Sequence, residues 1–294
     1  MKKQNEKINI GIVGFGFVGS AVAHGFSPHV GCDFTNIRIY DKDKKKSKDT
    51  LLDVASLSDI IFLSVPTPAN IKDGSIDLSI LDSALNDINK NLNGNSPIVL
   101  VRSTVIPGTC RDFQKKYETL RIVFNPEFLT ERSAKFDFIN QSRYVLGGDP
   151  QHTAKVAEMY RWRFGKSISV IETNTATAEL IKYMNNCFFA TKVSFMNEMK
   201  KVSDACGADW ESAVDGFIRD GRIGHSHLNV PGHDGKLGFG GVCFPKDILA
   251  MIDLGKELGV EMHTLQGAWA TNLEVRPEKD WEKLEGQAVV KKID

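Results

Sequence analysis

Short apolar runs separated by glycine- and proline-containing turns fill the first half of the chain. Runs rich in isoleucine and valine occupy residues 8–13, 37–41, 60–65 and 98–101, with shorter ones near 122–124, 144–146 and 167–171. Continuous apolar runs of about four to eight residues are typical of strands that are buried on both faces. The pattern predicts an α/β first half, with a doubly wound parallel sheet in a domain over residues 1–171.

The second half has the pattern of helices. Residues 173–207 form one long helical pattern, which Thr173 or Asn174 can cap and Gly207 can end. A helix, a loop over residues 220–242 and another helix follow. Residues 172–294 are therefore predicted to form a smaller all-helical domain, and its long helix is expected to form the core of a homodimer.

A polar stripe follows the predicted long helix. At about 100° per residue, four polar side chains fall within about 60° of one another; they are Glu179, Lys182, Asn186 and Asn197. Such a line on an otherwise apolar helix is either a solvent-facing side or a set of groups that points at a ligand. Lys182 and Asn186, one turn apart, suit contact with a ligand oxygen.

A glycine turn joins the first predicted strand to a helix that begins near Phe17. Gly14, Gly16 and Gly19 form G-x-G-x-x-G, a spacing that brings a pyrophosphate close to the backbone and the helix N-terminus. The second strand ends in Asp41, where an acid accepts hydrogen bonds from the ribose of NAD and repels the 2′-phosphate of NADP. We therefore predict a Rossmann domain that binds NAD.

Polar or proline-containing loops follow the later strands of this domain. They read PTPAN, RSTVIPGT and NPEFLTERSA. In a doubly wound sheet, ligands bind outside the carboxyl ends of the strands. These loops are therefore expected to line a cofactor or substrate site.

Composition limits the partners of the chain. Its 294 residues include 37 basic and 37 acidic side chains, so the net charge is zero, which argues against nucleic acid or an anionic membrane as a partner. No apolar run is long enough to span a bilayer, and no signal peptide is evident. The five scattered cysteines include no CxxC pair. We expect a cytoplasmic protein with reduced thiols.

The loop over residues 220–242 is longer than most structureless loops, which is typical of functional or disordered segments. It leads into GFGGVCFPKD, residues 238–247, so that Cys243 stands just before a helix, where thiol pKa values fall below the free value of ~8.5. The loop histidines lack the spacing of a known metal site, and no metal is expected. They are His225, His227 and His233.

Taken in order, the motifs resemble the UDP-glucose/GDP-mannose dehydrogenase family, the nucleotide-sugar 6-dehydrogenases. They are GIVGFGFVGSAVA, VPTP, STVIPGT, NPEFLTERSA, AELIKYMNNCFFATKVSFMNE, DGRIG and GFGGVCFPKD, between Ile8 and Asn272. The resemblance implies two successive NAD-dependent oxidations at one carbon, which take UDP-glucose to UDP-glucuronate.

The resemblance also implies catalytic roles. Cys243 would attack the aldehyde to give a thiohemiacetal, and a second oxidation would give a thioester that water hydrolyses. Lys182 and Asn186 would stabilise the oxyanion at that carbon. Asp247, with a water and Thr104, would transfer protons.

Further roles follow from the same resemblance. Glu127 would assist hydrolysis, and Arg222 would reach the substrate phosphate, across a dimer interface. The implied cofactor contacts are Gly14, Gly16, Phe17, Val18, Gly19, Asp41, Lys46, Val65, Pro66, Thr67, Ser103, Thr104, Glu131 and Lys246. The implied substrate contacts are Glu127, Phe128, Leu129, Glu131, Lys182, Asn186, Arg222, Phe239, Gly240 and Gly241.

One departure from the family leaves alternatives open. Full-length members carry a third domain that closes over the nucleotide, and we expect none here because the chain stops at Asp294. GDP-mannose and UDP-N-acetylhexosamines therefore stay alternative substrates. A 3-hydroxyacid or 6-phosphogluconate-type dehydrogenase, which needs no Cys243, and an inactive truncated NAD-binding module are the alternative functions.

Overall fold

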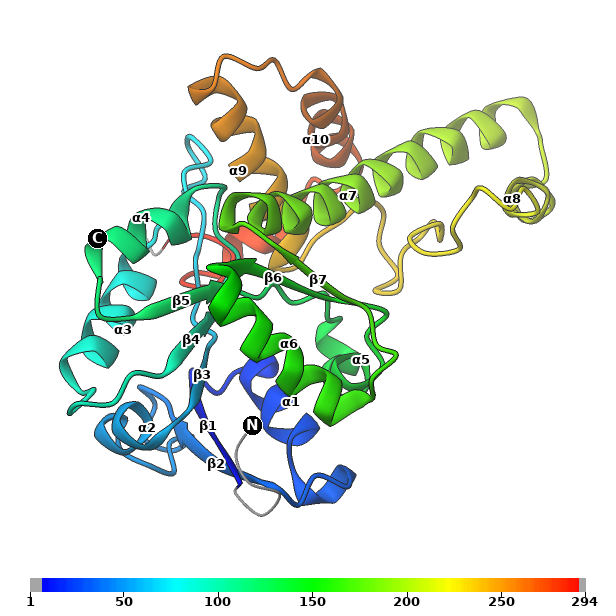
Figure 1. Ribbon diagram of the computed structural model, residues 1–294. Helices are drawn as coiled ribbons and strands as arrows, with labels where there is room; N and C mark the ends of the chain where they lie inside the picture. The colour runs from blue at the N-terminus through cyan, green and yellow to red at the C-terminus, as the bar shows by residue number, and fades with distance from the viewer. Residues whose placement is uncertain (1–6, 291–294) are drawn as a thin grey trace. The chain divides into compact units, whose positions relative to one another are not determined.

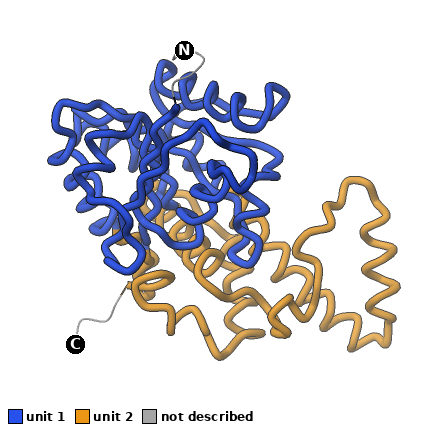
Figure 2. Tube along the Cα trace, turned by 90° about the horizontal axis from the view of Figure 1, so that it is seen from below, with its two compact units in different colours: residues 1–67, 78–182 blue, residues 68–77, 183–294 orange. Residues whose placement is uncertain are grey.

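The computed structural model describes residues 7–290 and divides the chain into two compact units. Unit 1 contains residues up to Thr67 together with Leu78–Lys182, and unit 2 contains Pro68–Asp77 and the chain from Tyr183 onward (Figure 2). The division falls inside a helix. The domain boundary expected after residue 171 stays a prediction, because contacts within a unit do not test independent folding.

A seven-stranded sheet forms the centre of unit 1 (Figure 1). Its strand order is β2-β1-β3-β4-β5-β6-β7, which confirms the predicted α/β architecture. The strands are β1 (Ile8–Val13), β2 (Thr35–Tyr40), β3 (Ile60–Leu63), β4 (Ile98–Val101), β5 (Arg121–Phe124), β6 (Tyr144–Gly148) and β7 (Val170–Thr173).

One pair of strands departs from the parallel arrangement. β6 runs antiparallel to β5, with Val123 opposite Gly148 and Phe124 opposite Gly147, whereas β6 and β7 are parallel to each other. An apolar run shows that a strand is buried and carries no information on its direction. The sheet is therefore mostly parallel.

Helices cover both faces of this sheet because the strand side chains alternate between two cores. Ile60 and Phe62 join the core under α1 (Phe17–Gly25), α5 (Ala134–Ile139) and α6 (Pro150–Phe164). Ile61 and Leu63 point to the opposite face and join the core under α2 (Leu51–Leu57), α3 (Ser79–Lys90) and α4 (Thr109–Lys116). Short 3₁₀ turns lie at Pro28–Val30 and Glu131–Ser133. The helix start predicted at Phe17 is confirmed.

Unit 2 is mainly helical. Most of α7 (Thr175–Cys206) belongs to it, followed by α8 (Trp210–Ile218), α9 (Cys243–Glu257), α10 (His263–Val275) and a 3₁₀ turn at Asp280–Lys283. The predicted long helix is confirmed within two residues at its N-terminus and one at its C-terminus. The chain between Ile218 and Cys243 contains no helix or strand, and α9 begins at Cys243 itself.

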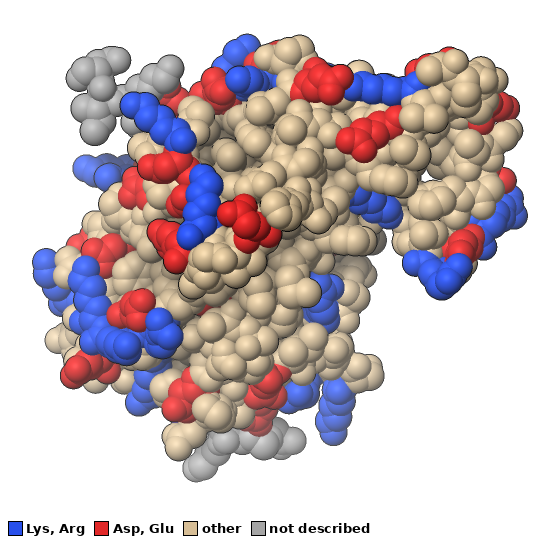
Figure 3. Space-filling view, turned by 90° about the horizontal axis from the view of Figure 1, so that it is seen from above, with Lys and Arg blue, Asp and Glu red and all other residues tan. Residues whose placement is uncertain are grey.

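Charged side chains of both signs are interspersed on the face drawn in Figure 3, in keeping with the balanced composition. Within the described residues, no helix is long and apolar enough to cross a membrane.

Candidate active site

The turn between β1 and α1 is formed by glycines that contact the protein's own backbone. Gly14 has φ +89°, and a Cβ placed there would lie 2.1 Å from the carbonyl oxygen of Ser64. A Cβ on Gly19 would lie 2.0 Å from the carbonyl oxygen of Gly14. Both positions are therefore restricted to glycine by packing inside unit 1.

Gly16 differs from its two neighbours in the motif. It is exposed, and no atom lies within 4 Å of the place where its Cβ would be. Gly16 is also the N-cap of α1 and makes no side-chain capping hydrogen bond to this end of the helix. The first turn of α1, which contains Phe17 and Val18, carries no acidic residue. Open N–H groups beside open space fit the pyrophosphate of a dinucleotide.

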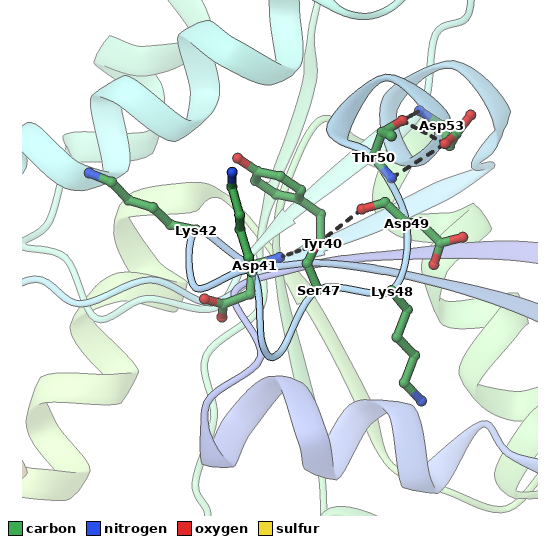
Figure 4. Close-up of a pocket in the computed structure, with 9 residues that line it drawn as sticks. Tyr40, Asp41, Lys42, Ser47, Lys48, Asp49, Thr50 and Asp53 are labelled. Atoms are coloured by element: carbon green, nitrogen blue, oxygen red, sulfur yellow. Dashed lines mark hydrogen bonds between the residues drawn. The ribbon is translucent and has the colours of Figure 1, made fainter.

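Asp41 follows β2 and is hydrogen-bonded to the glycine turn. Its carboxylate accepts hydrogen bonds from the backbone N–H groups of Phe15, at 2.6 Å, and Asp43, at 2.8 Å. A carboxylate has about four lone-pair positions, so these bonds leave acceptor capacity for a ribose. Asp41 also lines a surface hollow of about 460 Å³ with Lys42 and Ser47 (Figure 4). Lys46 is an exposed residue of the same loop.

The loops after β3 and β4 are joined by hydrogen bonds. The Ser103 hydroxyl accepts from the Val65 N–H at 3.0 Å and donates to the Val65 carbonyl at 2.7 Å. The Thr67 hydroxyl donates to the Thr104 carbonyl at 2.7 Å, and Pro66 between the two contacts is exposed. The structure thus brings together the two loops that follow neighbouring strands.

A buried ion pair lies behind the loop after β5. The Lys182 ammonium donates to the Glu127 carboxylate at 2.9 Å and to its backbone carbonyl at 2.6 Å. Burial alone would raise the pKa of Glu127, but the Lys182 charge and the Leu129 N–H outweigh it and hold that pKa below its usual value. Glu127 is therefore ionised at neutral pH. The ammonium also lies 5.5 Å from the centre of the Phe128 ring.

The polar stripe of α7 is not a solvent-facing side. Glu179 is fully buried, and Lys182, Asn186 and Asn197 are 3%, 6% and 3% exposed. Glu179 accepts hydrogen bonds from the backbone N–H groups of Gly108 and Cys110 and so caps the N-terminus of α4. Each of these polar groups has a partner inside its own unit.

The second polar cluster lies in unit 2, at the start of α9. Asp247 is fully buried, and one carboxylate oxygen accepts from the Asn186 amide at 2.6 Å. The other oxygen accepts from the Lys246 ammonium. Cys243 is half-buried at the first position of α9, one helical turn before these groups. A different thiol, that of Cys187, is buried near Asp247, and burial together with the Asp247 charge raises its pKa.

Other residues expected to bind substrate have different environments. The Phe239 ring is 4% exposed and packs with Ile248 and Ala268, which leaves little of it for a ligand. Arg222 is largely exposed and donates two hydrogen bonds to Asp220, at 2.9 and 2.6 Å. Glu131 is exposed in the 3₁₀ turn that follows the Glu127 loop.

Sequence reasoning missed buried polar residues in both units. In unit 1, the Arg102 guanidinium donates a hydrogen bond to the Asn125 side-chain oxygen at 2.6 Å. In unit 2, Asn272 on α10 and Arg276 at the C-cap of this helix, one turn later, bind the loop before Cys243. The i, i+4 spacing of Asn272 and Arg276 is the one signal in the sequence that points to a shared helix face. Within the described residues, no cluster of three or more potential metal ligands occurs.

Comparison with known proteins agrees with this arrangement. Residues 47–163 match the NAD-binding domain of the UDP-glucose/GDP-mannose dehydrogenase family, and residues 176–274 match its central domain. A UDP-glucose 6-dehydrogenase of Rickettsia typhi is 32% identical over 92% of this chain and 68% of its own length. The chain belongs to the UDP-glucose/GDP-mannose dehydrogenase family.

Two further relatives show the extent of the match. UDP-glucose 6-dehydrogenase TuaD of Bacillus subtilis is 36% identical over 73% of this chain, and the match spans 46% of the Bacillus protein. A UDP-glucose dehydrogenase structure from Pyrobaculum islandicum has a TM-score of 0.81 at 27% identity and covers 97% of this chain and 72% of its own. The chain thus spans 31% and 46% of the length of the first two curated relatives it matches.

Proposed function

We propose that this chain catalyses the four-electron oxidation of a nucleotide sugar, UDP-glucose to UDP-glucuronate, with NAD as the oxidant. The observation that carries the proposal is Cys243 at the first position of α9, followed within one turn by buried Lys246 and Asp247. Membership of the family supports the reaction class, and the names of the relatives support UDP-glucose as substrate.

Unit 1 supplies the cofactor site in this proposal. The open N-terminus of α1 at Gly16 would hold the pyrophosphate, and Asp41 would accept hydrogen bonds from the adenosine ribose. The Asp41 carboxylate would repel a 2′-phosphate, so NAD is preferred over NADP. When bound, NAD accepts one hydride in each of the two oxidations.

Unit 2 supplies the nucleophile. The first oxidation converts the primary alcohol to an aldehyde, and the Cys243 thiolate adds to its carbonyl carbon to form a C–S bond. The resulting thiohemiacetal keeps one transferable hydride, whose loss gives a thioester. Water then attacks the thioester, the C–S bond breaks, and the products are the carboxylate and the free thiol.

Further charged and polar groups assist these steps in the proposal. Lys182 and Asn186 stabilise the negative oxygen of the adduct, because fixed charges and dipoles act strongly in a site that excludes water. Asp247, with a water and Thr104, moves the alcohol proton, and ionised Glu127 directs the hydrolytic water.

The stoichiometry of NADH tests this reaction directly. With purified chain, NAD and UDP-glucose, two molecules of NADH should form for each sugar consumed. One NADH would indicate a simple alcohol dehydrogenase, and no NADH with UDP-glucose, GDP-mannose or UDP-N-acetylglucosamine would contradict the proposal. Faster turnover with GDP-mannose or UDP-N-acetylglucosamine would make that nucleotide sugar the substrate in place of UDP-glucose.

We also propose that two copies of the chain associate through α7. Large apolar side chains stay exposed along one side of this helix, with exposures from 37% to 65%. They are Met184, Phe188, Phe195, Met199 and Val202. Their spacing of three, four or seven residues puts them on one helical face, about 27 Å long at 1.5 Å per residue. A self-complementary apolar stripe of this kind suits a two-fold contact with the same helix of a second copy.

Light scattering on a paired set of variants tests the dimer. The wild-type chain should scatter as a dimer at micromolar concentration, and Phe188→Asp should scatter as a monomer because it places a charge in the apolar contact. Trp162→Asp is the matched control, since Trp162 is an exposed aromatic residue on α6 of unit 1. A monomeric wild-type chain, or a dimeric Phe188→Asp variant, would contradict this interface.

A further inference from the structure

The loop that leads to the thiol is held by side chains from two helices of unit 2. On α7, the Asn197 side-chain oxygen accepts a hydrogen bond from the Gly238 N–H at 3.2 Å. On α10, the Asn272 oxygen accepts from the Phe239 N–H at 2.7 Å, and its amide donates to the Phe239 carbonyl at 3.0 Å. A fully buried side chain that satisfies both polar groups of one loop residue fixes that residue closely.

Arg276, one helical turn after Asn272, also holds this loop. We call Asn272 and Arg276 the loop clamps. Its guanidinium is 3% exposed and donates to Asp280 at 2.6 Å, to Asp234 at 2.6 Å and to the Leu237 carbonyl at 3.2 Å. Asp280 in turn accepts from the Gly241 N–H at 3.3 Å. The planar fork of an arginine can satisfy three such acceptors at once, whereas a lysine ammonium is a point charge.

The glycines of the loop are explained by these clamps. A Cβ on Gly238 would lie 2.4 Å from the Asn272 side-chain oxygen. A Cβ on Gly240 would lie 2.5 Å from both the Arg276 guanidinium and the Asp280 carboxylate. The side-chain space of both glycines is thus taken by the chain's own α10 and the turn after it.

We propose that Asn272 and Arg276 are positioning residues for the Cys243 thiol. They fix residues 237–241, and the short connection from Gly241 to the start of α9 transmits that position to Cys243. The inference rests on the proposed role of Cys243 as nucleophile, because the thiol gains from exact placement only if it must meet a reacting carbon.

Native-state alkylation with iodoacetamide, read by peptide mass spectrometry, tests the inference without cofactor or substrate. Cys206, an exposed thiol at the end of α7, is the internal standard, since the buried thiols Cys32, Cys110 and Cys187 are shielded. In Asn272→Ala and Arg276→Lys, the alkylation rate of Cys243 relative to Cys206 should fall about tenfold, as expected when a thiol loses its alignment with a helix N-terminus. Glu274→Gln, which removes an exposed ion pair between α10 and Lys201, should leave the ratio unchanged.

Kinetics give a second readout that a purely structural role would not affect. With the enzyme kept well below its melting temperature, kcat should fall about 10²-fold in both clamp variants, as small misplacements of a reacting group do, while KM for NAD stays constant. If either variant does not fold, Asp280→Asn keeps the shape of the clamp, removes one charge and should lower the alkylation ratio to a smaller degree.

The outcomes separate this inference from the proposed function. An unchanged or increased alkylation ratio in the folded clamp variants would overturn the positioning role, even with a fully active wild-type enzyme. The other outcome is a reduced alkylation ratio in the variants together with a wild-type chain that forms no NADH. It would keep the positioning role and remove the dehydrogenase proposal instead.

Discussion

The two glycine-rich loops of this protein use the same residue for different reasons. In the motif at the start of α1, a Cβ on Gly14 or Gly19 would meet a backbone carbonyl, and Gly16 faces open space. In the loop before α9, a Cβ on Gly238 or Gly240 would meet side chains from the distant α10 and the turn after it. The first loop is built by local backbone geometry, and the second is built by tertiary contacts.

In the proposed function, the two loops hold different groups. An anion can be bound by backbone N–H groups at a helix start, so a self-contained turn is sufficient. The proposed nucleophilic thiol has to be placed against one carbon atom, and a long loop without secondary structure cannot do that alone. Side-chain clamps supply the rigidity that the loop lacks.

The largest effect is expected from removing the chemistry of the second loop. Cys243→Ser should lower formation of the acid by at least about 10³-fold, on the scale seen when a nucleophile is removed. Cys206→Ser, at an exposed thiol, should retain full turnover. Acid formation at a normal rate by folded Cys243→Ser would show that the loop holds no reacting group and would end the contrast between the two loops.

A smaller loss of activity is expected from a substitution in unit 1. The residue is Lys182, a charged side chain on α7 outside both glycine-rich loops. Lys182→Ala should reduce kcat by about 10²–10³-fold, since the ammonium acts when the oxyanion forms. The dissociation constant for NAD, measured by fluorescence titration, should not change. Lys200→Ala, at a lysine paired with Asp204 four residues later, is the control. Activity within a few-fold of wild type would limit Lys182 to its ion pair with Glu127.

The pair of Lys182 and Glu127 should also give unit 1 a defined pH dependence. Because the folded-state pKa of Glu127 lies below its ordinary value of 4.5, the carboxylate contributes stability above pH 4.5 that is lost as the pH falls below it. Glu127→Gln should lower the free energy of unfolding by about 3 kcal/mol at pH 7, where it leaves a buried ammonium unpaired. Urea unfolding should show this difference shrinking below pH 4.5, and a constant difference would contradict an ionised Glu127.

The smallest effects come from alanine substitutions at the glycines of the first motif. Gly19→Ala should lower the free energy of unfolding by about 1–3 kcal/mol, because its Cβ would overlap the Gly14 carbonyl oxygen. Gly16→Ala should change stability by less than about 0.5 kcal/mol and weaken NAD binding instead. Equal destabilisation by both changes, measured by thermal unfolding, would mean that Gly16 is also closed in by protein.

Local patterns in the sequence determined much of this protein. The apolar runs, the glycine turn and the start of α9 at Cys243 all follow from neighbouring residues, since burial periodicity and helix starts are local properties. The family motifs also led to the prediction that Cys243, Lys182 and Asp247 are catalytic, which stays a prediction. Strand direction was not accessible, and β6 accordingly differs from the parallel arrangement that was expected.

Tertiary structure decided which partners these groups have. Glu179 caps α4 across 71 residues, Asn272 holds Phe239 across 33, and Arg276 reaches Asp234 across 42. No single stretch of sequence contains both members of such a pair, and a polar residue on a helix gives no sign of whether water or a distant loop will satisfy it. The buried polar groups must find partners within the fold because desolvation without a hydrogen bond is costly. For this reason the sequence alone identified the groups proposed to do the chemistry, while only the fold revealed those that hold them.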